Sequence, residues 1–436
     1  MGLGVNGGGL GVTRFLVAQG ADVTVTDLRD ATVLQPSLDE LKGLPVRYVL
    51  GQHREEDFRS ADLVVRNPGV PRESRFLALA REHGAQIEME MTLFFRLCPG
   101  PILGITGTRG KTTTTLLAGA MLAEQHPDTV VAGNLRVSAL EQLPRITPST
   151  PVVLELSSWQ LEGLGEAELS PRYACVTNLS PDHLDRYRSM EQYAAAKKHI
   201  FLHQHAERGD VVVLNADDEC VREWAAEAPG RAAWFSTRKS YDELIGAFGS
   251  EAAWWHNDQL MWRDDPICSQ QDVHLQGEHN RANIAAAAAL VKCYQPPVPD
   301  EAVARAVSSF RGVPDRLELV RELDGVRYVN DTTATTPTAT MAALRALDAP
   351  IILIAGGADK QLDFSELAAC IGAGGKPGAS CGTVVRAVVL LAGTATPRLT
   401  GVLEAAGVHP AGVFDTLDAA VRRAHEFARP GDTVLL

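Results

Sequence analysis

The stretch from Pro101 to Leu117, PILGITGTRGKTTTTLL, constrains the fold of this chain more than any other part of the sequence. Its apolar start predicts a buried strand, its glycines predict a turn, and Lys111 opens a predicted helix. In such a turn, backbone N–H groups close around phosphate oxygens, the lysine reaches the β and γ phosphates, and the next hydroxyl binds Mg²⁺. The residues that we expect to contact a nucleotide are Gly107, Thr108, Gly110, Lys111, Thr112 and Thr113.

This stretch departs from the strict phosphate-loop pattern at one position. The pattern has a glycine six positions before its lysine, and this chain has Ile105 there. The shorter form G-T-x-G-K-T is intact from Gly107 to Thr112. A plain glycine turn between a strand and a helix is the alternative interpretation. The lysine and the threonine directly after the second glycine favour nucleotide binding.

Length and composition limit the class of protein. A chain of 436 residues is too long for one hydrophobic core, so two or three domains are expected. The net charge of −13, with no basic block to offset it, argues against nucleic-acid binding. The seven cysteines lack the spacing of a metal site or a disulfide framework, so we expect reduced thiols. The sequence contains no membrane-length apolar run and no signal peptide, and we expect a cytoplasmic enzyme without membrane insertion.

The chain begins with a second glycine turn. Gly2 to Gly7 fits G-x-G-x-x-G, and a predicted helix, a strand from Asp22 to Thr26 and then Asp27 follow. This arrangement is typical of a dinucleotide site, but a plain Rossmann turn or a site for another nucleotide fits equally. No strand precedes the glycines in the sequence, which suggests a clipped start. Another turn, with Asn67 and Gly69, follows the predicted strand from Asp62 to Val65.

The order of the predicted elements indicates an α/β protein of three domains. Residues 1–95 form a small Rossmann-like domain, and residues 96–295 form a domain in which strands and helices alternate. Such alternation predicts a mainly parallel sheet covered by helices. The proline cluster at 295–299 reads as a linker, and residues 296–436 form a third, Rossmann-like domain.

Acidic side chains follow two strands of the predicted central sheet. Glu155 ends the strand that starts at Val152, and Asp182, His183 and Asp185 follow the strand from Tyr173. The carboxyl ends of parallel strands share one edge, so these side chains would lie beside the phosphate loop and suit Mg²⁺. A helix cap at Asp182 and a surface histidine are the alternatives.

Together these motifs resemble the Mur ligase family, whose members build the peptide of bacterial cell-wall precursors with ATP. The resemblance covers the whole chain in order. It depends on GTRGKTTTT (107–115), GNL (133–135), ELSSWQL (155–161), TNLSPDHLDRY (177–187), YAAAKKHIF (193–201), GEHNRANIAAA (277–287), GVPDRLE (312–318), VNDTTATTP (329–337) and GGADKQLDF (356–364). Within the family, ELSSWQL and the Rossmann-like first domain are most similar to the member that adds D-glutamate.

The resemblance implies a reaction and its cofactors. ATP phosphorylates the L-alanine carboxylate of UDP-N-acetylmuramoyl-L-alanine, and the amine of D-glutamate attacks the acyl phosphate. Phosphoryl transfer between anions needs charge neutralisation and alignment, which Lys111 and two Mg²⁺ ions would supply. Thr112 and Glu155 resemble ligands of the first ion and His183 a ligand of the second.

Lys197 takes its predicted role from the resemblance alone. A lysine in the predicted helix from Tyr193 to Phe201 is by itself most often a surface charge. In the family the matching lysine is carbamylated and supports the second magnesium. The spacing Tyr-x-x-x-Lys selects Lys197 over Lys198.

The resemblance also implies the remaining site residues and partners. UDP would replace the dinucleotide at the first glycine turn, domain closure would complete the site, and we expect a monomer. By substrate, the implied contacts are Asp27, Arg29, Asn67 and Gly69 for the UDP end, Asn134 and Gln160 for the muramoyl-alanine end, Asn280, Asn283, Arg316 and Asp331 for ATP, and Thr335 and Lys360 for D-glutamate.

Thr333 departs from the family, which usually has a lysine there, and relatives continue past the position of Leu436 with a loop that lines the glutamate pocket. The alternatives are another ligase of the superfamily with a different amino acid, a non-catalytic nucleotide-binding relative, or an NAD-dependent oxidoreductase. The last would leave the central phosphate loop unexplained.

Overall fold

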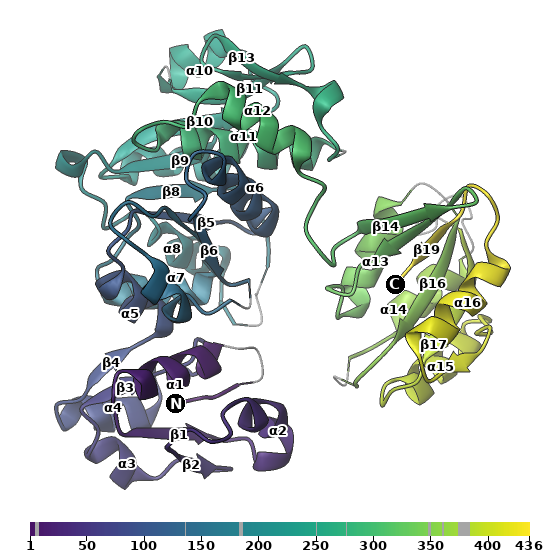
Figure 1. Ribbon diagram of the computed structural model, residues 1–436, viewed down its shortest axis with the longest axis horizontal. Coiled ribbons are helices and arrows are strands. Elements are labelled where there is room, and N and C mark those ends of the chain that lie inside the picture. Colours follow the sequence, from purple (N-terminus) through teal and green to yellow (C-terminus); the bar gives the residue numbers. More distant parts are fainter. Residues whose placement is uncertain are drawn as a thin grey trace. The chain divides into compact units, whose positions relative to one another are not determined.

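The computed structural model describes residues 1–4, 8–135, 137–182, 186–249, 251–275, 277–347, 350–359, 362–373 and 384–436. These residues form two compact units, Met1–Phe310 and Arg311–Leu436 (Figure 1). Both units alternate strands with helices and have mostly parallel sheets, so the predicted α/β class is confirmed.

The N-terminal part of the first unit contains two short parallel pairs of strands. β1 pairs with β2, and β3 pairs with β4. The backbone of Met1 and Gly2 lies between the pairs, because the amine of Met1 donates to Val65 O at 2.9 Å and Gly2 N donates to Thr26 O at 2.7 Å. The elements are α1 (Gly8–Ala18), β1 (Val23–Asp27), α2 (Ala31–Glu40), β2 (Val46–Leu50), α3 (Glu55–Arg59), β3 (Leu63–Val65), α4 (Arg75–Glu82), β4 (Gln86–Glu88) and α5 (Glu90–Leu97).

A nine-stranded sheet forms the centre of the first unit, in the order β13-β12-β11-β10-β9-β8-β5-β7-β6. The strands from β6 to β11 in this order are parallel, as predicted, and the phosphate-loop strand β5 lies between β7 and β8. The strands are β5 (Ile102–Thr106), β6 (Val130–Gly133), β7 (Val152–Glu155), β8 (Tyr173–Val176), β9 (Val211–Asn215), β10 (Arg231–Ser236), β11 (Ala252–His256), β12 (Gln259–Trp262) and β13 (Asp265–Ser269).

The sequence analysis missed the antiparallel edge made by β11, β12 and β13. Asn257 and Asp258 form the turn between β11 and β12, and both have positive φ, 46° and 61°. Asn and Asp tolerate this conformation, and two such residues in a two-residue loop are typical of a hairpin. The adjacent Asn257 and Asp258 were therefore the feature of the sequence that could have indicated this hairpin.

Both faces of the nine-stranded sheet are covered. Leu103 and Ile105 of β5 face a core shared with α6, α11 and α12, whereas Ile102 faces a core shared with α5, α7 and α10. Helix α11 is buried from Ile284 to Val291 and packs on α6. The helices are α6 (Lys111–Ala123), α7 (Ser158–Glu166), α8 (Met190–Lys198), α9 (Glu219–Glu223), α10 (Tyr241–Phe248), α11 (Glu278–Cys293) and α12 (Asp300–Ser309), with the 3-10 helices η1 (Leu140–Arg145), η2 (Ala206–Arg208), η3 (Trp224–Glu227) and η4 (Gln270–Asp272).

The second unit is built on a six-stranded sheet in the order β14-β15-β19-β16-β17-β18. The four strands predicted for this part are present, and two edge strands were not predicted, the antiparallel β14 and the short parallel β18. The elements are β14 (Glu318–Leu323), β15 (Val326–Asn330), α13 (Pro337–Ala346), β16 (Ile351–Gly356), α14 (Ser365–Gly372), β17 (Val385–Leu391), α15 (Thr396–Ala405), β18 (Val413–Phe414), α16 (Leu417–Phe427) and β19 (Thr433–Leu435).

Helix α12 lies in the first unit, where Arg305 Nε donates to Glu124 Oε2, directly after α6, at 2.8 Å. The division at 1–95, 96–295 and 296–436 stays a prediction. Cys370 is disulfide-bonded, so the expectation of reduced thiols is wrong at this residue, whereas five other cysteines of the described chain are free.

Candidate active site

The phosphate loop has the predicted strand, turn and helix. β5 ends at Thr106, the turn contains two glycines with positive φ, and α6 begins at Lys111. A Cβ atom on Gly107 would lie 1.9 Å from Thr177 Oγ1, and one on Gly110 would lie 2.2 Å from Asn283 Oδ1. Only glycine fits either position, because neighbouring elements leave no room and the backbone is in a left-handed conformation.

Residues of the segment after β8 form hydrogen bonds with the phosphate loop on one side. Thr108 N donates to Asn178 O at 2.9 Å, and Arg109 N donates to Asn178 Oδ1 at 3.0 Å. Ser180 N donates in turn to Thr108 Oγ1 at 3.0 Å. These bonds hold the turn, and the first turn of α6 supplies N–H groups at the position where a helix binds phosphate. The sequence analysis missed this role of Asn178, which its place at the carboxyl end of a neighbouring strand could have indicated.

The two predicted catalytic lysines converge on one carbonyl group. Lys111 Nζ donates to Gly107 O at 3.1 Å and to Thr108 O at 2.9 Å. Lys197 Nζ, from α8, donates to Gly107 O at 2.7 Å. Lys197 is therefore placed at the phosphate loop and not on the surface, where a lysine of this helix would be expected from sequence pattern alone.

Lys197 is 1% exposed, and its ammonium lies 4.6 Å from the ring centroid of Tyr193, one helical turn earlier. Burial and then the charge of Lys111 lower the pKa of Lys197 from 10.5 to about 7, although Asp182 and Glu155 act in the opposite direction. A substantial fraction of the side chain is therefore a neutral amine near pH 7.5, the form that is nucleophilic. The sequence analysis did not identify Tyr193 as part of the site, although the spacing of four residues on a helix was visible.

Glu155 joins two other predicted site residues by hydrogen bonds. Thr112 Oγ1 donates to Glu155 Oε2 at 2.6 Å, and Asn134 Nδ2 donates to Glu155 Oε1 at 2.8 Å. Glu155 is 2% exposed, so its carboxylate lies at the buried base of the loop. A carboxylate and a hydroxyl beside a phosphate site fit Mg²⁺, which is commonly held by one or two carboxylates, waters and substrate phosphates. The described residues contain no group of three or more His, Cys, Asp or Glu arranged as a full metal site.

Two of the residues predicted to contact ATP, Asn280 and Asn283, lie in the first part of α11, next to the loop. Asn283 Nδ2 donates to Asn280 Oδ1 at 3.2 Å, and Thr114 Oγ1 of α6 donates to Asn283 Oδ1 at 3.5 Å. Gln160, predicted for the muramoyl end, caps the start of α7, since Ser157 N and Ser157 Oγ both donate to Gln160 Oε1 at 2.9 Å. Thr113 is half-buried in the first turn of α6.

A second polar cluster surrounds the start of the chain. Gly4 N donates to Asp27 Oδ2 at 3.1 Å, and Arg29 N donates to Asp27 Oδ1 at 2.9 Å. Burial raises the pKa of Asp27, but hydrogen bonds from Arg29 and Gly4 outweigh this effect and hold the pKa below its usual value. Asn67 accepts a bond from Gly69 N at 3.1 Å. Asp27, Arg29 and Asn67 thus gather around Gly4 at the carboxyl end of β1.

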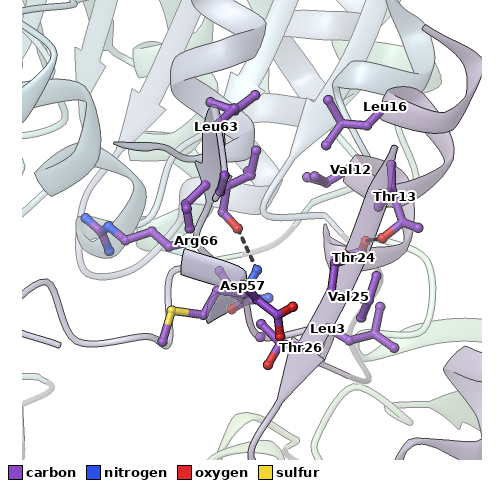
Figure 2. Close-up of a pocket in the computed structure, with 18 of the residues that line it drawn as sticks. Leu3, Val12, Thr13, Leu16, Thr24, Val25, Thr26, Asp57, Leu63 and Arg66 are labelled. Atoms are coloured by element: carbon purple, nitrogen blue, oxygen red, sulfur yellow. Dashed lines mark hydrogen bonds between the residues drawn. The ribbon is translucent and has the colours of Figure 1, made fainter. Parts of the chain in front are cut away.

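A cavity of about 440 Å³ lies next to this cluster, between β1 and β3. Figure 2 shows Thr24 and Val25 of β1 on one side and Leu63 and Arg66 on the other. Met1 also lines the cavity, and its amine donates to Val65 O. Strands β1 and β3 and helices α1 and α3 line it, and of the four residues predicted for the UDP end only Asn67 is among the lining residues. Ligands of α/β sheets bind outside the carboxyl ends of the strands. We therefore do not assign the UDP site to this cavity.

The other predicted residues are placed in the second unit or lie outside the described residues. Asp331 is 7% exposed and accepts a bond from Leu317 N at 3.0 Å. Burial raises the pKa of Asp331, while this bond and the charge of Arg316 lower it. Thr335 N donates to Thr333 O at 2.9 Å. Among the residues predicted for the sites, His183, Asp185 and Lys360 lie outside the described residues.

Comparison with known proteins identifies relatives along the whole chain. The Mur ligase MurD-like N-terminal domain matches residues 1–88, the Mur ligase middle domain matches residues 105–291, and the Mur ligase glutamate ligase domain matches residues 315–436. The oxidoreductase interpretation is therefore set aside. No helix in the described part of the chain is long and apolar enough to cross a membrane.

Two curated relatives carry the name UDP-N-acetylmuramoylalanine–D-glutamate ligase. The protein of Roseiflexus sp. (strain RS-1) is 58% identical over 445 residues, which cover 100% of this chain and 92% of the relative. That of Symbiobacterium thermophilum is 39% identical over 441 residues, covering 100% and 91%.

Solved structures support the fold. UDP-N-acetylmuramate–alanine ligase MurC from Thermotoga maritima is 19% identical with a TM-score of 0.56, covering 100% of this chain and 93% of that one. MurF from Acinetobacter baumannii is 18% identical with a TM-score of 0.57, covering 87% and 88%. With three domain matches in order and a relative 58% identical from end to end, the chain belongs to the Mur ligase family.

Proposed function

We propose that this protein is an ATP-dependent ligase that joins D-glutamate to UDP-N-acetylmuramoyl-L-alanine in peptidoglycan precursor synthesis. The observation that carries the proposal is the convergence of Lys111, Lys197 and the Thr112–Glu155 pair on a loop that only glycine can form. Full-length identity of 58% to a ligase of this name supports the choice of substrates. As a Mur ligase the protein uses ATP, generally with Mg²⁺.

Formation of the amide requires that a carboxylate first becomes a better electrophile. ATP phosphorylates the alanine carboxylate, the amine of D-glutamate attacks the acyl phosphate, and phosphate leaves. The first turn of α6 binds the phosphates, and Lys111 moves from the loop carbonyls to the transferring phosphoryl group, where its charge stabilises the transition state. Thr112 and Glu155 would hold one Mg²⁺ ion and His183 and Lys197 a second, and these ions would supply further charge neutralisation.

Lys197 reaches its role by carbamylation in this proposal. Its neutral amine attacks the carbon of CO₂, loses a proton and becomes an anionic carbamate. Burial and the lowered pKa support this step, because only the neutral amine reacts. The product places an anionic carbamate in place of the amine beside Gly107, and its oxygens are ligands of the kind that Mg²⁺ prefers.

The remaining proposed contacts can be grouped by the two ends of UDP-N-acetylmuramoyl-L-alanine. Asp27, Arg29, Asn67 and Gly69 bind the UDP end, and their grouping around Gly4 supports this assignment. Asn134 and Gln160 bind the muramoyl-alanine end. For the other substrates, the proposed contacts are Asn280, Asn283, Arg316 and Asp331 for ATP, and Thr335 and Lys360 for D-glutamate. The monomeric state and the cytoplasmic location stay predictions.

ADP release tests the reaction. ADP should form with ATP, UDP-N-acetylmuramoyl-L-alanine and D-glutamate together and should fall to background when any one is omitted. L-alanine, L-glutamate and diaminopimelate should replace D-glutamate poorly. Equal turnover with one of them would overturn the assigned amino acid, and no ADP from the complete mixture would overturn the function.

The D-glutamate contact has its own test. Lys360→Ala should raise KM for D-glutamate about 10- to 150-fold, the value of one charge-assisted hydrogen bond. KM for ATP should change far less. A variant that loses ATP affinity alone would show that Lys360 is misassigned.

A further inference from the structure

The N-terminal region and the nine-stranded sheet meet at a junction built around Glu90, the first residue of α5. Ser138 Oγ donates to Glu90 Oε1 at 2.5 Å, and the backbone N–H groups of Ala139 and Leu140 also donate to this carboxylate. These two residues open η1. The carboxylate of Glu90 in α5 therefore accepts hydrogen bonds from backbone N–H groups at the start of η1, which packs with the nine-stranded sheet.

Helix α1 packs directly against this pair. A Cβ atom on Gly11 would lie 2.0 Å from Ser138 Oγ, and one on Gly8 would lie 3.2 Å from Glu90 Oε2. There is no room for a side chain at Gly11. Helix α1 therefore packs closely against Glu90 and Ser138.

The same contacts continue to the phosphate loop. Gly133 N donates to the carbonyl of Val137, which precedes Ser138, at 3.3 Å. Asn134, next to Gly133, donates to Glu155, and Glu155 accepts the bond from Thr112 at the start of α6. From Ser138 to Thr112 each step is a hydrogen bond or one peptide unit, and α1 joins this path through the packing of Gly11 against Ser138. A continuous path therefore runs from α1 to α6.

We infer that Glu90 is a positioning residue that acts through Ser138 to hold Asn134 and Glu155 in place and to set the separation between the two glycine turns. The inference rests on the proposed function, in which one substrate extends from UDP at the first turn to a carboxylate at the phosphate loop. A separation that is wrong by about 1 Å misaligns the two reacting groups by an amount that can lower the rate about 100-fold.

The charges around Glu90 come from η1 and α1. Glu141 of η1 repels the carboxylate, and Arg14 of α1 lies 3.4 Å from Glu141. Burial, only partly offset by the bonds from Ser138, Ala139 and Leu140, raises the pKa of Glu90 to about 7. The Ser138 hydroxyl can donate to the ionised or the neutral acid, so the bond itself survives titration.

The test compares E90A with E90Q and with a control at the same junction. E166A removes the carboxylate that accepts from Arg66 Nη2 at 3.4 Å, a bond that joins the loop after β3 to α7. E90A should lower kcat/KM for UDP-N-acetylmuramoyl-L-alanine about 10- to 150-fold, the factor that corresponds to the loss of one charge-assisted hydrogen bond. KM for ATP should stay within about twofold, and E90Q, whose amide oxygen still accepts from Ser138, should keep most of the activity.

Hydrogen exchange supplies a readout that needs no substrate. In E90A the amides of α1 and η1 should exchange faster than in E166A, while those of β5 and β9 should not change. Unchanged exchange in α1 and η1, or an equal change of KM for both substrates, would overturn the inference. If the wild-type protein makes no ADP, the proposed function fails by itself, and the exchange data still decide the role of Glu90.

Discussion

The chain has two glycine motifs that each precede a helix, and the surroundings of their described residues differ. The phosphate loop follows a fully buried strand, is fastened by the segment after β8, and receives two lysines. The N-terminal turn adjoins two short pairs of strands with a cavity of about 440 Å³ between them, and its nearby charges are Asp27 and Arg29. A glycine pattern therefore specifies a turn, whereas the charged side chains around the turn specify what it binds.

The largest expected effect comes from removing the cation of the phosphate loop. Lys111→Ala should lower kcat for ADP formation by at least about 10²- to 10³-fold, because a charge aimed at the transition state is lost. Steady-state ADP release measures this effect. Arg109→Ala is the matched control, since it removes a charge from the same loop and keeps the backbone bonds to Asn178. Near-wild-type turnover of Lys111→Ala would show that the loop does not perform the chemistry.

Substitution of Lys197 tests whether this side chain acts as an anionic carbamate. Lys197→Ala should be about 10²-fold or more less active, as expected for loss of a charged group at the reacting phosphate. Acetate should restore part of the activity by replacing the carbamate. The neighbouring Lys198, paired with Glu227 at 2.5 Å, provides the control Lys198→Ala, which should stay active. An active Lys197→Ala without additive would remove the basis for carbamylation.

The N-terminal turn should discriminate UDP from a dinucleotide. Arg29→Ala should raise KM for UDP-N-acetylmuramoyl-L-alanine about tenfold through loss of one charged contact and leave KM for ATP unchanged. Arg47→Ala, which loses a bond to Thr24 on β1, serves as the control. Calorimetric titration of the wild type with NAD should show no saturable binding. Micromolar affinity for NAD would reverse the assignment of this turn.

The smallest effect concerns the junction between the two turns. Between pH 4.5 and about 7, the folded chain keeps a proton on Glu90 that the unfolded chain has lost. The free energy of unfolding should therefore fall as pH rises through this window, by roughly 1–3 kcal/mol. Glu90→Gln should flatten this slope in denaturant titrations at several pH values. Parallel curves for the variant and the wild type would show that Glu90 does not retain the proton.

Much of the catalytic architecture was predictable because it is local in sequence. The phosphate loop is one continuous stretch, and Glu155 lies at the end of an apolar strand that must be parallel to it. The burial of Lys197 was not predictable from pattern, since it depends on Gly107, 90 residues away. The Glu90–Ser138 bond joins residues 48 apart on different elements, and no periodicity reports such a contact.

Helix α11 has a consequence for the entropy of the site. From Ile284 to Val291 it is buried, and five of these residues are consecutive alanines. Alanine has no side-chain rotamers to lose, so burying this stretch removes little conformational freedom. The same helix presents Asn280 and Asn283 beside the phosphate loop. These two side chains lie on a helix that is already ordered. A nucleotide that contacts them therefore restricts little additional backbone motion, and the entropic cost of binding is small.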